Sequence, residues 1–351
     1  MAAAEYVAIP PRGDFVPHHT SDLALTGADA NARRLDALRR AVFTLPADFS
    51  AAPSSGVDPL TTPVPACRLL PDDPSGTTPK FDCVFAGGQT VKVKYGHDPE
   101  IHGEVAATAL LRMLGYAADS VTMVERLRCY GCPRHPFVAM HLRRKFHLPF
   151  VREQIDDGYT DFEWVSVERK FPAPAIETDT LDGWEWRELD KSLQPQAEID
   201  AFRLVAAFLA HWDNKSTNQR LVCLDRQPSG GDCQRPLAMI QDLGASFGPP
   251  KVNLARWRDL PVWYDRTTCT VSMRALPYEG ATFEDVQISE AGRALAASRL
   301  SAITDAQIER IFADARFPQF QAGTDDERDL KAWTHAFKSR VAQIVGARCA
   351  S

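Results

Sequence analysis

The feature that most constrains this chain is an apolar helical repeat that runs directly into a polar loop. The repeat has three- and four-residue spacing, which predicts a buried helix, and consists of Ile199, Phe202, Val205, Phe208 and Leu209. The loop 211–218 follows at once and reads H-x-D-x-K-x-x-N, and the later turn 241–244 reads Q-D-L-G. Two short apolar runs, 220–224 and 237–240, flank the turn-rich segment 227–231 and predict a β-hairpin between the loop and the turn.

Three polar side chains in these segments have the chemistry and the order that phosphoryl transfer from ATP requires. A carboxylate must orient the acceptor hydroxyl, and oxygen ligands must hold the Mg²⁺ that bridges the phosphates. Asp213 would take the first role, and Asn218 and Asp242 would bind the metal. Lys215 would neutralise charge on the transferring phosphoryl group, and His211 is expected to brace the loop. Each half of the pattern is common by itself, but both halves together with the helix and the hairpin predict a phosphotransferase.

The rest of the chain predicts an α+β, two-lobed, protein-kinase-like fold. Residues 1–65 are rich in Pro and Ala and predict an arm with a helical patch near 31–45. Residues 66–142 predict a small β-rich lobe with one helix, and residues 143–351 predict a larger, mainly helical lobe with a Trp-rich insertion near 160–190. The elements expected in the small lobe are strands at 80–85, 90–95, 121–127 and 137–142 and a helix from Pro99 to Gly115. The C-terminal helices are expected at 288–300, 305–315 and 326–344, the second with a capping box at Thr304 to Gln307.

The small lobe also holds the residues expected to bind the ATP phosphates. Lys92 and Lys94 share one face of a strand, and either could be the phosphate lysine; we favour Lys94, with Glu104 on the next helix as its partner. The turn before the first hairpin strand contains small residues and could direct backbone N–H groups at phosphate oxygens, although a plain polar turn explains it equally well. The residues expected to bind phosphate in this turn are Gly76, Thr77, Thr78 and Lys80.

The order of these motifs resembles the atypical branch of the protein-kinase-like superfamily. It is closest to the HipA-type kinases, with echoes of phosphoinositide kinases. The HipA-type Gly-x-x-Pro-Lys loop is matched by 76–80, its strand lysine by Lys94, its helix glutamate by Glu104, and its D-x-x-x-x-N loop by 213–218. The resemblance covers roughly residues 75–250 and implies ATP and Mg²⁺ as cofactors. The chain departs from it at Lys215, where HipA-type loops usually have His, and no A-P-E segment follows Asp242.

Composition narrows the possible partners. The chain has 351 residues, of which 44% are hydrophobic and 25% are charged, with a net charge of −6. These values predict a soluble globular protein that does not bind nucleic acid. No run of apolar residues is long enough for a membrane span. The N-terminus lacks the features of a signal peptide, so the default expectation is the cytoplasm, with an exported mature form as the alternative.

Eight cysteines are few for this length and do not predict a disulfide scaffold. Cys129-x-x-Cys132, with His135 nearby, has the spacing of half a zinc site, but buried thiols or a local disulfide are favoured because a second pair is missing. Cys223 and Cys233 could staple the predicted hairpin in an exported protein.

The sequence leaves two questions open. The acceptor could be a hydroxyl of a protein, a lipid or a small molecule, and the basic triplet 143–145 is either an attraction for an anionic acceptor or a solvated surface. A nucleotide-binding pseudokinase that serves as an interaction module remains an alternative to the active kinase, as does an enzyme of the same fold that transfers AMP.

Overall fold

A computed structural model describes residues 15–17, 22–49, 58–71, 75–146, 158–189, 195–225, 233–274, 276, 283–320 and 323–349. The chain divides into two compact units. Unit 1 comprises Met1–His19, Ala52–Asp98 and Thr122–Lys170. Unit 2 comprises Thr20–Ala51, Pro99–Val121 and Phe171–Ser351. The two units are described separately below, and together they give the mixed α+β content that the sequence predicts.

Unit 1 is built on a closed five-stranded barrel with strand order β2-β3-β4-β6-β5. The strands are β2 (Ala66–Leu70), β3 (Lys80–Phe85), β4 (Thr90–Lys94), β5 (Ser120–Tyr130) and β6 (Tyr159–Arg169). The predicted hairpin β3–β4 is confirmed, and it turns at Gly87 and Gly88, whose φ angles of 91° and 86° suit glycine. Apolar side chains of alternate residues, among them Phe81, Val93 and Val167, fill the barrel.

Two elements of unit 1 differ from the sequence expectation. The segment expected as strand 137–142 is helix α3 (Pro136–Lys145). Proline suits the first turn of a helix, and only Pro136 and Met140 of this helix are buried, at the four-residue spacing of one helix face. Strand β6 lies where we expected the start of a Trp-rich insertion, and it pairs with β4 in antiparallel orientation. The basic triplet 143–145 forms the last turn of α3.

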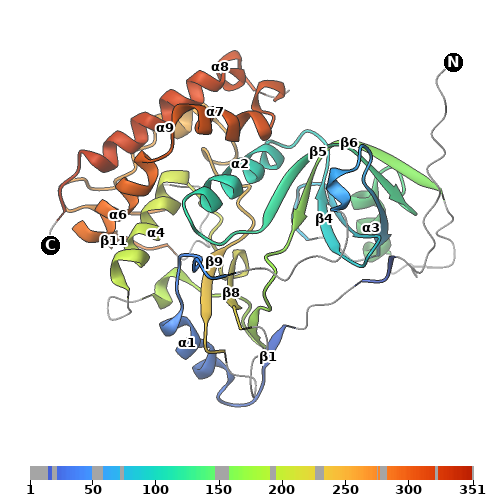
Figure 1. Cartoon of the computed structure of the whole chain (residues 1–351), viewed down its shortest axis with the longest axis horizontal. Coiled ribbons are helices and arrows are strands. Elements are labelled where there is room, and N and C mark those ends of the chain that lie inside the picture. The colour runs from blue at the N-terminus through green and yellow to red at the C-terminus, as the bar shows by residue number, and fades with distance from the viewer. Residues whose placement is uncertain are drawn as a thin grey trace. The chain divides into compact units, whose positions relative to one another are not determined.

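Unit 2 is mainly helical, and its central helix is α4 (Gln196–Leu209). Every residue of α4 from Ile199 to Leu209 is buried, which confirms the predicted helix. Helix α6 (Glu290–Ser301) packs against α4, and α9 (Leu330–Val345) packs against α6 and α7 (Figure 1). Helix α9 also packs against α5. The other helices are α1 (Ala30–Arg40), α2 (Pro99–Met113), α5 (Leu254–Asp259), α6 (Glu290–Ser301), α7 (Asp305–Asp314), α8 (Asp325–Arg328) and α9 (Leu330–Val345). The capping box of Thr304 and Gln307 is present at the start of α7.

Short strands complete unit 2. The predicted hairpin forms between β8 (Gln219–Cys223) and β9 (Pro236–Ile240), which are antiparallel. The turn at 227–231 that we expected between them lies outside the described residues. The other strand pairs are β1 (Leu23–Leu25) with β7 (Ile176–Thr178), which are parallel, and β10 (Thr270–Val271) with β11 (Val286–Gln287). Strand β1 and helix α1, which lie in the expected N-terminal arm, belong to unit 2. Among the described residues, no helix is both long and apolar enough to cross a membrane.

All eight cysteines are paired, which corrects the expectation from their low number. The disulfides are Cys67–Cys83, Cys129–Cys132, Cys223–Cys233 and Cys269–Cys349. The local disulfide favoured at Cys129 and Cys132 is confirmed, and it excludes the zinc alternative there, because a sulfur in a disulfide is not the thiolate that zinc binds. Cys223, Asp225 and Cys233 cluster closely enough to hold a metal, but both sulfurs belong to one disulfide. That disulfide staples the β8–β9 hairpin, as proposed for an exported chain.

Candidate functional site

Helix α4 ends by turning its chain sharply into the polar loop. Ala210 adopts the left-handed conformation, with φ of 54°, and the N–H of His211 donates to the carbonyl oxygen of Ala206 at 3.1 Å. His211 is fully buried, and burial lowers its pKa to about 4 in spite of the opposing carboxylates of Asp213 and Asp242. The ring is neutral at neutral pH, so His211 serves the packing of the loop.

The loop is held together by side-chain hydrogen bonds around Asp213. Asn218 donates from Nδ2 to the carbonyl oxygen of Asp213 at 2.7 Å. Lys215 donates from Nζ to both carboxylate oxygens of Asp213, at 2.9 and 3.0 Å. Asn214 donates from Nδ2 to the carbonyl oxygen of His211 at 3.2 Å. The loop therefore presents a carboxylate with a lysine ammonium directly against it.

The turn that contains Asp242 is hydrogen-bonded to this loop. The N–H of Gln241 donates to the carbonyl oxygen of Asn218 at 2.9 Å, and Gln241 Nε2 donates to the carbonyl oxygen of Thr217 at 2.8 Å. Asp242 has a φ of 52°, which is uncommon outside glycine. The structure thus brings the turn that contains Asp242 to the loop that contains Asp213 and Asn218, which lies more than 20 residues earlier in the sequence.

The side chains present in this place fit a magnesium ion. Because the amide nitrogen of Asn218 is engaged by the carbonyl of Asp213, its Oδ1 atom is the one left to coordinate a cation. Asp242, next to Gln241, supplies a carboxylate. Oxygen ligands of this kind, with water and phosphate oxygens completing the shell, are those that Mg²⁺ prefers.

The Trp-rich segment packs against the back of the loop, which the sequence did not predict. A Cβ atom on Gly183 would lie 1.9 Å from the carbonyl oxygen of Gln219 and 2.2 Å from that of Ser216, so this position requires glycine. Trp184 is fully buried and donates from Nε1 to the carbonyl oxygen of Arg220 at 3.1 Å. Arg34 of α1 donates to the carbonyl oxygen of Gly183 at 3.1 Å. No pattern in the sequence marks Gly183 or Arg34.

A buried arginine supports the end of α4. Arg340 on α9 is completely buried and donates to the carbonyl oxygens of Ala207 and Phe208, at 3.1 Å each, and to that of Trp257 at 2.6 Å. Burial lowers the pKa of Arg340 to about 9, so the guanidinium remains charged at neutral pH. A cation at the C-terminal carbonyls of α4 is favourable because the helix dipole is negative there.

Helix α2, which carries the predicted Glu104, packs closely on the loop after Asp242. A Cβ on Gly103 would lie 2.8 Å from Cγ2 of Val252 and 3.0 Å from the carbonyl oxygen of Gly244. Lys251 pairs with Glu100 of the same helix at 3.5 Å. Glu104 itself is buried, with 2% of its surface exposed.

The remaining predicted residues lie in unit 1. Gly76 has a φ of 79°, and a Cβ there would lie 3.3 Å from Nζ of Lys80. Thr78 is buried and donates from Oγ1 to Asp98 at 3.4 Å, whereas Thr77 is exposed. Lys80 and Lys94 are both buried. The turn and the two lysines are therefore neighbours within unit 1.

Lys92 has a different environment from Lys94. Its Nζ lies 3.5 Å from Glu168, which also pairs with Lys170 at 2.6 Å. Burial raises the pKa of Glu168, but Lys170, Lys92 and Lys94 together outweigh it and bring the pKa to about 2. Glu168 was not predicted because it lies in the unexpected strand β6.

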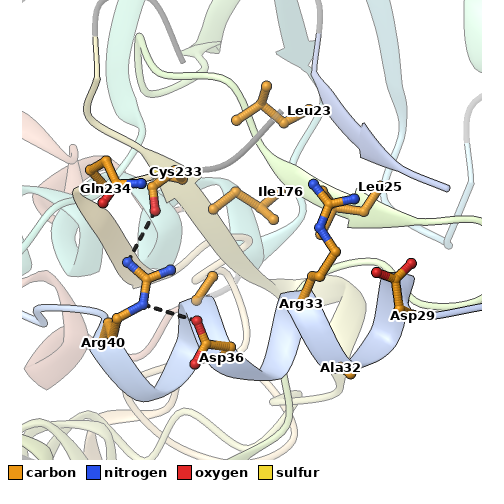
Figure 2. A pocket seen from close by; sticks show the side chains of 11 residues that line it. Leu23, Leu25, Asp29, Ala32, Arg33, Asp36, Arg40, Ile176, Cys233 and Gln234 are labelled. Atoms are coloured by element: carbon orange, nitrogen blue, oxygen red, sulfur yellow. Dashed lines mark hydrogen bonds and ion pairs between the residues drawn. The ribbon is translucent and has the colours of Figure 1, made fainter. Parts of the chain in front are cut away.

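A pocket elsewhere in unit 2 contains none of the predicted site residues (Figure 2). Its volume is about 560 Å³, and it lies between α1 and the β1–β7 pair. Arg40 closes one end by donating to Asp36 and to the carbonyl oxygen of Cys233, at 3.1 Å each.

Comparison with known proteins gives distant structural matches. The chain matches no protein-family model, and no curated protein sequence matches it. The crystal structure of a Helicobacter pylori proinflammatory kinase, CtkA, is 11% identical, covers 80% of this chain and 94% of its own, and has a TM-score of 0.44. The Golgi casein kinase is 12% identical, covers 82% of this chain and 72% of its own, and has a TM-score of 0.36. HipA of Shewanella oneidensis MR-1, in a complex with HipB and operator DNA, is 12% identical, covers 96% and 74%, and has a TM-score of 0.32.

The chain is similar to kinases and to HipA. These are the classes of protein that its motif order resembles.

Proposed function

We propose that this chain is an ATP- and Mg²⁺-dependent phosphotransferase that moves the γ-phosphoryl group of ATP to a hydroxyl of a protein, a lipid or a small molecule. The observation that carries the proposal is that Asn218 makes two hydrogen bonds, one with its side chain and one with its backbone carbonyl. Its side chain bonds to the backbone of Asp213, and its own carbonyl accepts from the residue before Asp242. One residue thus joins the loop that carries the Asp213 carboxylate to the turn that carries the Asp242 carboxylate, and phosphoryl transfer requires two carboxylates of this kind.

Each residue predicted for the site has a role in this proposal. Asp213 orients the acceptor hydroxyl and accepts its proton. Asn218 and Asp242 hold Mg²⁺, which offsets the charge of the phosphates when it is bound. Lys215, whose Nζ lies 2.9 Å from the Asp213 carboxylate, neutralises charge on the transferring group. The turn 76–80 and Lys94 hold the phosphates, and Glu104 positions Lys94.

The proposal extends to the organisation of the chain. Unit 1 contains the β-rich part of the predicted small lobe at 66–142, and unit 2 contains the mainly helical part of the predicted lobe at 143–351. We take these units as the two lobes of a kinase-like fold; the residues expected as the arm 1–65 are divided between them, and helix α2, expected in the small lobe, belongs to unit 2.

The test is transfer of label from γ-³²P-ATP with Mg²⁺ to the protein itself or to a generic protein acceptor. Asp242→Asn and Asp213→Asn should each abolish the label, because they remove a metal ligand and the acceptor-orienting carboxylate. Asp259→Asn is the matched control, since Asp259 is an exposed aspartate of unit 2 that pairs with Arg258. Its label should equal that of the unaltered protein.

The other readings give different outcomes. Label from α-³²P-ATP but not from γ-³²P-ATP would replace phosphoryl transfer by AMP transfer. ATP binding without transfer from either position, with lipid and small-molecule hydroxyls also offered, would leave the pseudokinase.

A further inference from the structure

Helix α3 of unit 1 buries one side and exposes apolar side chains on the other. Pro136 and Met140 are buried, and Met140 belongs to the apolar core of the barrel. Val138 and Leu142 each follow a buried position by two residues, which places them on the opposite side of the helix. Phe146, at the end of α3, continues this side at the same four-residue spacing. The exposed fractions of Val138, Leu142 and Phe146 are 53%, 48% and 61%, so the outer side of α3 carries an apolar stripe that faces solvent.

Positive charge is concentrated beside this apolar stripe. The last turn of α3 contains Arg143, Arg144 and Lys145, and both Arg144 and Lys145 are exposed. The sequence 134–146 contains a further arginine, Arg134, and no Asp or Glu. The whole chain has a net charge of −6, so this short basic segment has the opposite sign to the rest of the protein. An exposed helix that is both apolar and basic is typical of a surface that binds anionic partners.

The start of α3 is fixed to the barrel of unit 1. The backbone N–H of Phe137 donates to the hydroxyl oxygen of Tyr95 at 3.2 Å. The disulfide Cys129–Cys132 ties the end of β5 to the segment that leads into the helix. Thr160 of β6 donates from Oγ1 to the carbonyl oxygen of Cys132 at 2.7 Å. The exposed side of α3 is therefore already in place, and little ordering of the chain is needed when a partner binds.

The surface of an anionic membrane is complementary to both parts of this helix face. Apolar side chains of an amphipathic helix enter the boundary between headgroups and acyl chains, while its cations attract the anionic headgroups. Lys and Arg side chains are long enough to reach the headgroups while their methylene groups remain on the apolar side. A helix face is convex, and a fluid lipid surface adapts to it without a complementary groove.

We propose that α3 docks the protein on the surface of an anionic lipid membrane. Val138, Leu142 and Phe146 enter the boundary between headgroups and acyl chains, and Arg144 and Lys145 bind the headgroups. This role gives the basic triplet 143–145 a partner, which the sequence left open. It rests on the exposed side of α3 alone and does not depend on phosphoryl transfer.

Cosedimentation of the full chain with lipid vesicles tests the proposal. The protein should pellet with vesicles of an equal mixture of phosphatidylserine and phosphatidylcholine more strongly than with vesicles of phosphatidylcholine alone. Binding to the mixed vesicles should weaken as salt is added, because ions screen the attraction between surface charges. A protein that does not pellet with the mixed vesicles at low salt overturns the proposal. If such a protein instead binds poly-glutamate, the partner of α3 is an acidic protein and not a membrane.

Two double variants remove the two parts of the surface separately. Arg144→Gln with Lys145→Gln should weaken binding to the mixed vesicles by about twentyfold, since each cation near an anionic surface contributes about a factor of five. Leu142→Ser with Phe146→Ser should weaken it by about twentyfold as well, since each inserted apolar side chain contributes about a factor of five.

Matched controls use exposed residues of unit 2. Arg310→Gln removes a cation of α7 whose side chain is 83% exposed, and Val345→Ser removes an apolar side chain of α9 that is 45% exposed. Both should bind the mixed vesicles within about twofold of the unaltered protein. Thermal unfolding checks that every variant is folded, and exposed substitutions of this kind should leave the melting temperature nearly unchanged.

The pattern of losses decides between insertion and simple adsorption. Loss of binding in the variant without the two cations, but not in the variant without Leu142 and Phe146, would show adsorption by charge alone and overturn the proposed insertion. Normal binding in both variants would place the membrane contact elsewhere on the chain and overturn the role of α3.

The Phe146→Trp variant reports insertion directly. Lipids with bromine on their acyl chains quench tryptophan that reaches the acyl region, so mixed vesicles of such lipids should quench this variant more than the unaltered protein. Equal quenching of the two proteins would show that position 146 stays outside the membrane and overturn the proposal. None of these measurements involves transfer of label from ATP, so the membrane surface and the proposed function stand or fall separately.

Discussion

At the scale of single residues, burial and neighbouring charge decide what a side chain can do. Lys92 and Lys94 are of the same type and share one strand face, yet Lys92 faces Glu168 and Lys94 lies between Lys80 and Ser166. His211 precedes the catalytic-type Asp213 by two residues, but complete burial keeps its imidazole neutral. The sequence identifies these residues as candidates, and their surroundings assign them different roles.

His211 gives a prediction for the dependence of stability on pH. Its folded-state pKa of about 4 lies below the usual value, so between the two the unfolded chain binds a proton that the folded chain does not. The contribution of this group to the free energy of unfolding should therefore fall by about 2 kcal/mol between pH 7 and pH 5. Urea unfolding at the two values measures it.

The control for this experiment is a second histidine. The His211→Asn variant should lose most of this pH dependence of the free energy of unfolding, even if the substitution also destabilises the protein at pH 7. His335→Asn, at an exposed position of α9, should keep the dependence of the unaltered protein. An equal slope in His211→Asn and the unaltered protein would mean that His211 is not the group responsible.

At the scale of elements, the sequence predicted the helices and strands whose buried residues recur at one regular spacing. Helix α4, helix α2 with its Pro99 start and Gly115 end, and hairpins β3–β4 and β8–β9 were all predicted from periodicity and turn residues. Helix α3 was mistaken for a strand because its apolar residues are largely exposed: Val138 is 53% exposed and Leu142 48%. The spacing of apolar residues indicates which side of an element faces the core, and α3 buries little of its apolar surface.

The contact between the Trp-rich segment and the loop gives a prediction at this scale. Gly183→Ala should destabilise the protein by more than about 3 kcal/mol, because its Cβ would lie 1.9 Å from the carbonyl oxygen of Gln219. Gly87→Ala is the control, since Gly87 also has a positive φ but has nothing within 4 Å of an added Cβ. It should cost only about 1–2 kcal/mol, the strain of the backbone alone. Chemical denaturation measures both, and equal losses would contradict the close contact.

At the scale of the whole molecule, four disulfides cross-link the chain over very different sequence separations. Cys269–Cys349 joins residues 80 apart in the sequence and connects the strand β10 region to the C-terminus. Cys129–Cys132 joins residues only three apart. A set of four disulfides that uses every cysteine is expected in a protein that folds in an oxidising compartment, so it favours the exported form over the cytoplasmic default.

Loop length predicts how much each cross-link stabilises the protein. Replacing both Cys269 and Cys349 by Ala should lower the free energy of unfolding by about 4 kcal/mol, and replacing both Cys129 and Cys132 by about 2 kcal/mol, because the longer loop restricts the unfolded chain more. Urea unfolding without reductant measures both. A larger loss for the short loop would contradict this ordering, and a native mass equal to that of the fully reduced chain would contradict the disulfides themselves.

The sequence by itself determined the mixed α+β class, the helix that leads into the loop, and the order in which Asp213, Asn218 and Asp242 follow it. These features depend on periods and spacings within short segments, which a linear chain displays directly. Only the tertiary structure decided the pairing of Cys67 with Cys83 and of Cys269 with Cys349, the fit of Gly183 behind the loop, the support of α4 by Arg340, and the register that places Ser166 beside Lys94. Each of these depends on residues far apart in the sequence that meet through strand register or close packing, and no local pattern encodes such a meeting.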